Sequence, residues 1–222
     1  MSQQKWSEVD AYYTDLLLRP NPVLDEVARA CNAAGLPPIA VSEAQGKFLY
    51  LLASIQGAGK ILEIGTLGGY STIWLARALG EGGRLISLEY EERHAAVARD
   101  NIKLAGLDKI AEVRVGKALD RLPEIEANEE GPFDLIFIDA DKPNNPNYLT
   151  WAMKLTKPGS VIVSDNVVRN GNILDEQSLD KNIQGLRRFN EMVADDSRVT
   201  STVIQTVGEK GYDGFMLTRV IS

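Results

Sequence analysis

The sequence predicts an α/β fold in which helices cover both faces of a mostly parallel sheet. From about residue 60, short apolar runs alternate with segments whose apolar residues recur at helical spacing. Near the end of the chain, two apolar runs are joined by only six residues. So short a connection forms a hairpin, and the sheet should therefore finish with an antiparallel strand.

The strand predictions rest on short runs rich in aliphatic and β-branched residues. Five of these runs are separated by helical patterns, so crossover connections should make their strands parallel. They are KILEIG (60–65), RLISLE (84–89), AEVRV (111–115), FDLIFID (133–139) and GSVIVSD (159–165). The hairpin consists of VTSTVIQTV (199–207) and GFMLTRVI (214–221).

The helix predictions rest on apolar residues three or four positions apart. Five helices follow the strands, at 70–79, 91–106, 117–128, 147–156 and 178–196. Three more precede the first strand, at 3–18, 21–34 and 42–56, and could form a helical cap or a dimer surface. We expect a single domain over 1–222, with an N-terminal cap (1–57) and a Rossmann-like core (58–222), because no convincing linker interrupts the chain.

Composition limits the classes of function. The net charge of −7, with no basic run, disfavours nucleic-acid binding, and no apolar run approaches the ~18 residues of a membrane span. The polar N-terminus and the single cysteine, Cys31, lead us to expect a cytoplasmic protein. His94 is the only histidine, so a multi-histidine metal site is ruled out and any metal must have oxygen ligands. We expect His94 to be a solvated helix residue rather than a general base.

The first strand runs into a glycine-rich turn, EIGTLGGYS (63–71). Its glycines, Gly65, Gly68 and Gly69, do not have the spacing of the dinucleotide fingerprint. Glu63 would oppose a pyrophosphate but would suit a cationic ligand. Glu89, at the end of the second strand, can accept hydrogen bonds from ribose hydroxyls. This pattern resembles the cofactor turn of class I S-adenosylmethionine methyltransferases; the alternative is that the glycines only make a tight strand-to-helix turn.

Carboxylates follow two other strands of the predicted sheet. Asp139 comes at the end of the fourth strand, and Asp165 and Asn166 end the fifth. Parallel strands present their carboxyl ends to one crevice, so these three side chains can lie together. Two carboxylates and an amide suit Mg²⁺, Mn²⁺ or Ca²⁺ rather than zinc. The alternative is a polar sheet end without a metal.

Taken in order, EIGTLGGYS, SLE, FIDADK and VSDNVV resemble the cation-dependent O-methyltransferases of the catechol and caffeoyl-CoA group, and the bacterial members most of all. The resemblance extends from VSEAQGKFL (41–49) to the terminal KGYDGFMLT, which is most of the chain. It implies a class I methyltransferase fold, a three-layer sandwich with strand order 3-2-1-4-5-7-6 and strand seven antiparallel. It also implies S-adenosylmethionine as cofactor, a catechol-type small molecule (caffeoyl or flavonoid, for example) as acceptor, and a homodimer through the N-terminal helices.

The resemblance also assigns residues. The cofactor would contact the first turn, the ends of neighbouring strands and one loop residue: Val41, Glu63, Gly65, Thr66, Gly69, Ser71, Glu89, Ala118 and Asp139. The metal ligands would be Asp139, Asp165 and Asn166, and the catalytic lysine would be Lys142. Candidates for the substrate wall are Val168, Arg169 and Tyr212, the last placed in the hairpin turn.

Two interpretations of Lys142 remain open from the residues themselves. A buried lysine beside a cation has a lowered pKa and can act as a general base. Alternatively, Lys142 could form a salt bridge with Asp141 at the strand end, and the family resemblance favours the base. We expect Asp141 to support the site rather than bind the metal. The sequence Lys142-Pro143-Asn144-Asn145 departs from relatives, which often have Asn then Tyr after the lysine, and this leaves the local pocket shape open.

Three other functions were weighed against the catechol-type reaction. One is methyl transfer from S-adenosylmethionine to a hydroxyl of a sugar or a secondary metabolite. Another is an NAD-dependent oxidoreductase on a similar sheet, although its fingerprint spacing and a Tyr-x-x-x-Lys pair are missing. The third is a non-catalytic protein that binds S-adenosylmethionine.

Overall fold

The computed structural model describes residues 2–222. Seven strands form one sheet in the order β3-β2-β1-β4-β5-β7-β6. Strand β7 runs antiparallel to both neighbours, and the other pairs are parallel. The order and direction predicted for all seven strands are confirmed. The strands are β1 (Lys60–Ile64), β2 (Arg84–Glu89), β3 (Ala111–Val115), β4 (Phe133–Ile138), β5 (Thr156–Asp165), β6 (Val199–Gly208) and β7 (Gly211–Val220).

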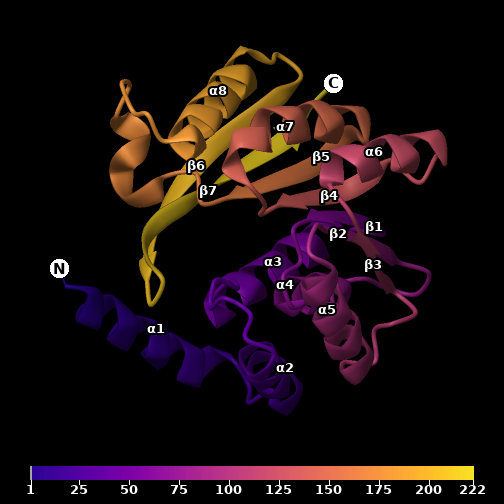
Figure 1. The fold of residues 1–222 in the computed structure, drawn as a ribbon, viewed down its shortest axis with the longest axis vertical. Coiled ribbons are helices and arrows are strands. Elements are labelled where there is room, and N and C mark those ends of the chain that lie inside the picture. The colour runs from indigo at the N-terminus through magenta and orange to yellow at the C-terminus, as the bar shows by residue number, and fades with distance from the viewer. Residues whose placement is uncertain (1) are drawn as a thin grey trace.

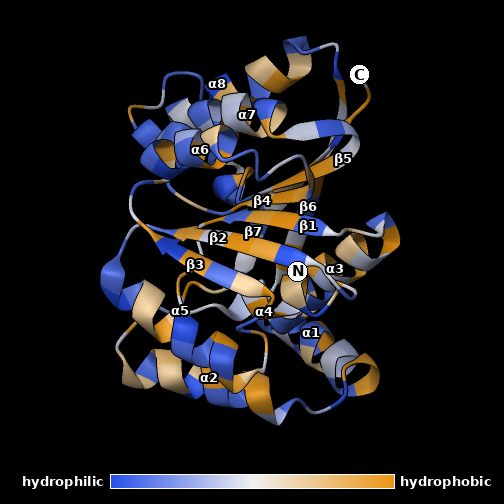
Figure 2. Ribbon diagram, turned by 90° about the vertical axis from the view of Figure 1, so that its right-hand side faces the viewer, coloured by the Kyte–Doolittle hydropathy of each residue, from blue (hydrophilic) through white to orange (hydrophobic). Residues whose placement is uncertain are grey.

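Helices cover both faces of the sheet (Figures 1 and 2). On one side lie α1 (Gln3–Leu17), α2 (Pro22–Ala33), α3 (Glu43–Gln56), α4 (Tyr70–Ala76) and α5 (Glu92–Leu104). On the other lie α6 (Ala118–Ala127), α7 (Asn145–Lys154) and α8 (Lys181–Asp195), and two 3₁₀ helices, η1 (Lys142–Asn144) and η2 (Arg169–Leu174), follow β4 and β5. Within residues 2–222, no helix combines the length and apolarity that crossing a membrane requires.

The central strands are buried on both faces. In β4, Leu135 and Phe137 pack toward α3, α4 and α5, while Ile136 and Ile138 pack toward α6 and α7. This two-sided burial explains why the sequence of β4 is a continuous apolar run rather than an alternating one. Trp74 is buried in the first of these layers.

The C-terminal hairpin is tighter than the sequence predicted. Strands β6 and β7 stay paired up to Gly208 and Gly211, so the connection has two residues instead of six. Gly211, at a φ of 95°, permits this close turn. Tyr212 therefore lies in β7, opposite Val207, and not in the turn. Because β7 is antiparallel, this turn lies at the carboxyl end of β5.

Helix α1 lies on the outside of the molecule, beside the hairpin turn (Figure 1). None of its residues is buried, and Tyr12, Leu16 and Leu17 are all exposed. Hydrogen bonds of two of its side chains, Gln3 and Asp10, hold it to the turn. The Gln3 side chain donates to the Gly208 carbonyl at 2.7 Å, and the Glu209 N–H donates to the Asp10 carboxylate, also at 2.7 Å.

Candidate active site

A cavity of about 1050 Å³ opens at the carboxyl ends of β1, β2, β4 and β5. Most of the site residues predicted from the sequence line it: Val41, Gly65, Thr66, Ser71, Glu89, Ala118, Asp139, Lys142, Asp165, Asn166, Arg169 and Tyr212. The fold therefore brings the glycine-rich turn and the carboxylates after β4 and β5 to one place. Three candidates, Glu63, Gly69 and Val168, do not line the cavity.

Gly65 is required where the first turn touches the end of β4. Its φ is 96°, and a Cβ there would collide with the backbone carbonyl of Asp139. Any side chain at this position would therefore separate the two loops. Gly69, with a φ of 85°, starts α4 and packs against Ala98 rather than toward the cavity.

Glu63 lies behind the cavity wall. Its carboxylate is fully buried and accepts hydrogen bonds from the hydroxyls of Ser71 (2.6 Å), Ser87 (2.5 Å) and Thr72. Burial raises the pKa of Glu63, and the three hydroxyls partly offset this effect. The sequence placed Glu63 against the ligand, whereas in the structure it holds Ser71, which itself lines the cavity.

Glu89 organises the loops around the end of β2. Its carboxylate accepts backbone N–H groups from Thr66 (3.2 Å), Leu67 (2.8 Å) and Glu91 (3.0 Å). His94 lies 3.6 Å from the same carboxylate, and its side chain is 23% exposed. His94 is a partly exposed helix residue, as predicted, but the first turn of α5 directs its side chain toward β2 and the cavity rather than away from the protein.

Lys142 is buried and pairs with Asp139. Its Nζ lies 3.1 Å from Asp139 Oδ1, and the residue is 6% exposed. The salt bridge with Asp141 considered from the sequence does not form. Asp141 instead accepts hydrogen bonds from the Asn144 amide (2.6 Å) and the Tyr148 hydroxyl. Burial and the bond to Asp141 raise the pKa of Tyr148, so this phenol stays protonated and fixes the loop after β4.

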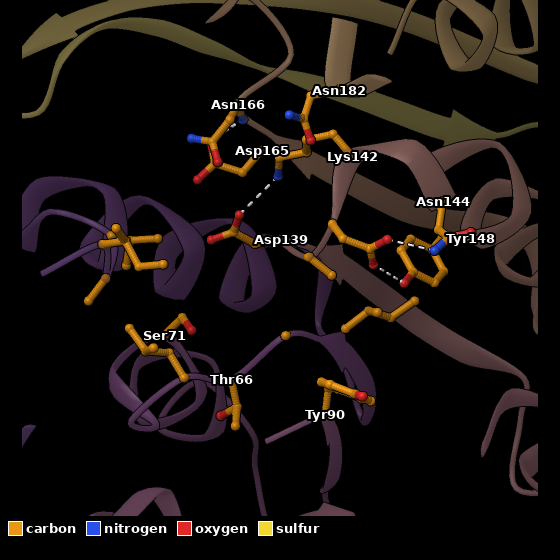
Figure 3. Close-up of a pocket in the computed structure, with 18 of the residues that line it drawn as sticks. Thr66, Ser71, Tyr90, Asp139, Lys142, Asn144, Tyr148, Asp165, Asn166 and Asn182 are labelled. Carbon is orange, nitrogen blue, oxygen red and sulfur yellow. Dashed lines mark hydrogen bonds and ion pairs between the residues drawn. The ribbon is translucent and has the colours of Figure 1, made fainter. Parts of the chain in front are cut away.

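Asp165 ends β5 and is 4% exposed. Its Oδ1 accepts the Asn166 N–H at 2.8 Å, and its Oδ2 accepts the side-chain amide of Gln45 at 2.7 Å. Burial raises the pKa of Asp165, and the charge of Asp139 raises it further, against the opposing effect of Lys142. In Figure 3, Asp165, Asn166 and Lys142 lie together on one side of Asp139, and Ser71 and Thr66 lie on the other.

Asp139, Asp165 and Asn166 form a set of oxygen donors that fits a hard divalent cation. Two carboxylates and one amide face the same cavity, and Lys142 forms a salt bridge with one of the carboxylates, that of Asp139. Among the residues that the structure describes, no three or more His, Cys, Asp or Glu side chains gather in a way that could hold a metal ion, and the third oxygen donor of this set is the Asn166 amide. Oxygen donors of this kind suit Mg²⁺, Mn²⁺ or Ca²⁺.

The far wall of the cavity is built by η2, the start of α8 and the hairpin. Asp213 joins two of these elements, because one of its oxygens accepts N–H groups from Val168 (3.0 Å), Arg169 (2.9 Å) and Gly214 (2.9 Å). The sequence did not indicate several lining residues, among them Ile39, Gln45, Asn182, Ile183 and Lys210. They come from the N-terminal cap, α8 and the hairpin, and only the fold brings those segments to the strand ends.

The chain is similar in sequence to proteins of one known family. Residues 17–221 match the O-methyltransferase family. A catechol O-methyltransferase of Niastella koreensis is 50% identical over 220 residues, which cover 99% of this chain and 100% of that protein. A catechol O-methyltransferase of Mycobacterium tuberculosis is 51% identical over 213 residues, which cover 96% of this chain and 95% of that one.

Solved structures agree with these sequence relatives. The O-methyltransferase from Bacillus cereus in complex with SAH has a TM-score of 0.98 at 55% identity, over 99% of this chain and 100% of that one. An O-methyltransferase from Streptomyces achromogenes, involved in tomaymycin synthesis and in complex with SAM, has a TM-score of 0.97 at 49% identity over 100% of both chains. With its fold, its cavity and its sequence in agreement, the chain belongs to the O-methyltransferase family.

Proposed function

We propose that this O-methyltransferase transfers a methyl group from S-adenosylmethionine to one hydroxyl of a vicinal dihydroxyphenol, with the help of a divalent cation. The observation that carries the proposal is the cluster of Asp139, Lys142, Asp165 and Asn166, which shares one cavity with the glycine-rich turn. The two catechol O-methyltransferases with about half of their residues identical support this choice of acceptor.

S-adenosylmethionine would bind at the turn after β1 and supply an activated methyl group on a sulfonium centre. Gly65 allows close approach to the backbone, and Ser71, held by Glu63, presents a hydroxyl oxygen to the cavity. Glu89 keeps the loops after β1 and β2 in place. The bound SAH and SAM in the two structural relatives support this assignment.

The divalent cation, Mg²⁺ in the first instance with Mn²⁺ or Ca²⁺ as alternatives, would be held by Asp139, Asp165 and Asn166. When bound, it would lower the pKa of a phenol and orient two adjacent hydroxyls. A free phenol with a pKa near ~10 is mostly protonated at neutral pH, so the reaction also needs a proton acceptor.

We propose that Lys142 is this proton acceptor. Its buried Nζ lies beside Asp139, at the cavity wall, and in the neutral amine form it would accept the phenol proton and become an ammonium group paired with Asp139. The confined position favours a role in the reaction over a surface ion pair. Arg169 and Tyr212, from η2 and β7, would then contact the rest of the acceptor.

We further propose that the enzyme is a homodimer through α1. A 15-residue helix is marginal by itself in water, and α1 buries no residue within this chain. Its exposed Tyr12, Leu16 and Leu17 provide an apolar surface that a second copy would cover.

The proposed reaction is tested with a substrate panel read by mass spectrometry. The panel pairs a 1,2-dihydroxyphenol with its 1,3-isomer and its monohydroxy analogue, and adds a sugar alcohol. We expect methylation of the 1,2-isomer alone, lost with EDTA and restored by Mg²⁺. Equal rates on the 1,2- and 1,3-isomers would contradict chelation, while transfer that continues in EDTA would contradict the cation. Preference for the sugar alcohol would point to the alternative acceptor class.

A further inference from the structure

We infer that Gln45 is a positioning residue, which holds the carboxylate of Asp165 in the orientation that the divalent cation needs. The inference rests on the proposed function. Gln45 Nε2 donates to Asp165 Oδ2 at 2.7 Å, although the two residues are 120 positions apart in the sequence. Gln45 also lines the same cavity as Asp165. It is the contact through which the N-terminal cap reaches the carboxylate cluster.

The first turn of α3 is held in place, so the position of Gln45 is well defined. Ser42 caps the helix and accepts the backbone N–H of Gln45 at 3.2 Å. The ring of Trp74 occupies the space in which a Cβ at Gly46 would lie, and Leu49 is buried one turn later. Because the helix cannot rotate without breaking these contacts, the amide of Gln45 keeps its direction toward the cavity.

The hydrogen bonds at Asp165 explain why a donor is needed there. The carboxylate is almost fully buried, so hydrogen bonds from the protein govern its orientation. Each oxygen has one donor, the Asn166 N–H at Oδ1 and the Gln45 amide at Oδ2. A carboxylate oxygen has two lone pairs, so each oxygen keeps one for a cation. These two bonds therefore set the plane of the carboxylate without using up its capacity to bind.

Gln45 and Lys142 act on the two carboxylates in different ways. Lys142 brings a positive charge to Asp139, whereas Gln45 brings a neutral amide to Asp165. The charge of Asp165 is thus left available to the cation. Mutating a residue that hydrogen-bonds to a metal-binding side chain lowers metal affinity by roughly 10- to 100-fold, and we expect the contribution of Gln45 to lie within this range.

The test compares Gln45→Met with Gln56→Met. Both changes keep the length of the side chain and remove the amide donor. Gln56, the last residue of α3, donates to the Gly159 carbonyl at 2.8 Å and does not line the cavity. Mn²⁺ affinity is measured by calorimetry on the full-length protein with saturating S-adenosylmethionine and no acceptor. Melting temperature without metal and affinity for S-adenosylmethionine are measured on both variants.

We expect Gln45→Met to weaken Mn²⁺ binding by about 10-fold or more, and Gln56→Met to change it by less than about twofold. Activity of Gln45→Met should return at saturating Mn²⁺. Unchanged Mn²⁺ affinity in Gln45→Met would overturn the inference and leave the cation site intact. A greater loss of melting temperature than in Gln56→Met would also overturn it, since the role would then be structural. If the wild-type protein binds no Mn²⁺, the proposed cation requirement fails as well.

Discussion

Replacing Gly185 with alanine tests whether the placement of Lys142 controls the reaction. Gly185 is the point at which α8 touches the backbone of η1. A Cβ at this position would lie 2.5 Å from the Lys142 carbonyl oxygen and 2.6 Å from Pro143 Cα. Both are backbone atoms, so no side chain can rotate away to make room. Either α8 or the segment carrying Lys142 must move.

The size of the effect follows from these distances. Ordinary contact begins at 3.4 Å, so the clash requires a shift of about 0.9 Å. Overpacking of this kind costs about 1–3 kcal/mol, and the better helix propensity of alanine returns about 1 kcal/mol. The free energy of unfolding should therefore fall by at most about 2 kcal/mol. A misplacement of about 1 Å can cost ~100-fold in rate, so kcat should fall much more than stability does.

The assay pairs methyl transfer under saturating substrates with urea unfolding. Gly80→Ala is the matched control, because nothing lies within 4 Å of a Cβ at Gly80 and its backbone is not left-handed. We expect kcat to be reduced about 100-fold in Gly185→Ala and unchanged in Gly80→Ala. If Gly185→Ala loses the expected stability but keeps the wild-type kcat, the position of Lys142 does not limit the reaction.

Three further predictions concern stability and assembly. The hydrogen bond from Arg114, together with the charge of the neighbouring Arg84, lowers the pKa of Glu112 from 4.5 to about 2. The stability that ionised Glu112 contributes is therefore present above pH 4.5 and is lost as the pH falls through about 2. Glu112→Gln should lower the free energy of unfolding by less than ~1 kcal/mol at pH 7, because the Arg84–Glu112 pair is about half exposed. Urea unfolding at several pH values should show this difference disappear near pH 2, and a difference that does not depend on pH would contradict this reasoning. Phe189 lies on the buried face of α8 and is 1% exposed, so Phe189→Ala should lower the free energy of unfolding by about 3–5 kcal/mol in urea unfolding. A loss below about 1 kcal/mol would mean that the neighbouring side chains collapse into the cavity that this change leaves. Leu16→Asp should shift the protein from dimer to monomer in sedimentation velocity, and an unchanged sedimentation coefficient would place the dimer surface elsewhere.

The strands themselves could be predicted from the sequence because their signals are local, whereas their order in the sheet was implied by the family resemblance. The apolar run of β4 and the motif at its end are each contained in a few residues, and the hairpin required only proximity along the chain. The details of the hairpin were harder. Gly208 and Gly211 fall in the predicted connection between the strands, but in the structure Gly208 ends β6 and Gly211 starts β7. Gly214 permits close pairing of these strands, because a Cβ there would lie only 2.6 Å from the Ile204 carbonyl oxygen.

The candidate site was predictable where one side chain follows one strand end, as for Asp139 and Asp165. It was not predictable where the partner comes from a distant element. The three hydroxyls around Glu63 come from α4 and β2, and the donor to Asp165 comes from α3. For His94, helical periodicity gave the helix correctly but not which side of it would face β2.

The antiparallel direction of β7 has a consequence for how such enzymes diversify. The turn between β6 and β7 lies beside the cavity, and Lys210 and Tyr212 form part of the cavity wall. Residues inserted in this turn would alter that wall without changing the register of β6 with β7, and β6, at the edge of the sheet, has no other neighbouring strand. The hairpin is thus a place where evolution or an engineer can lengthen the chain and change which acceptors enter, while the carboxylates after β4 and β5 stay where they are.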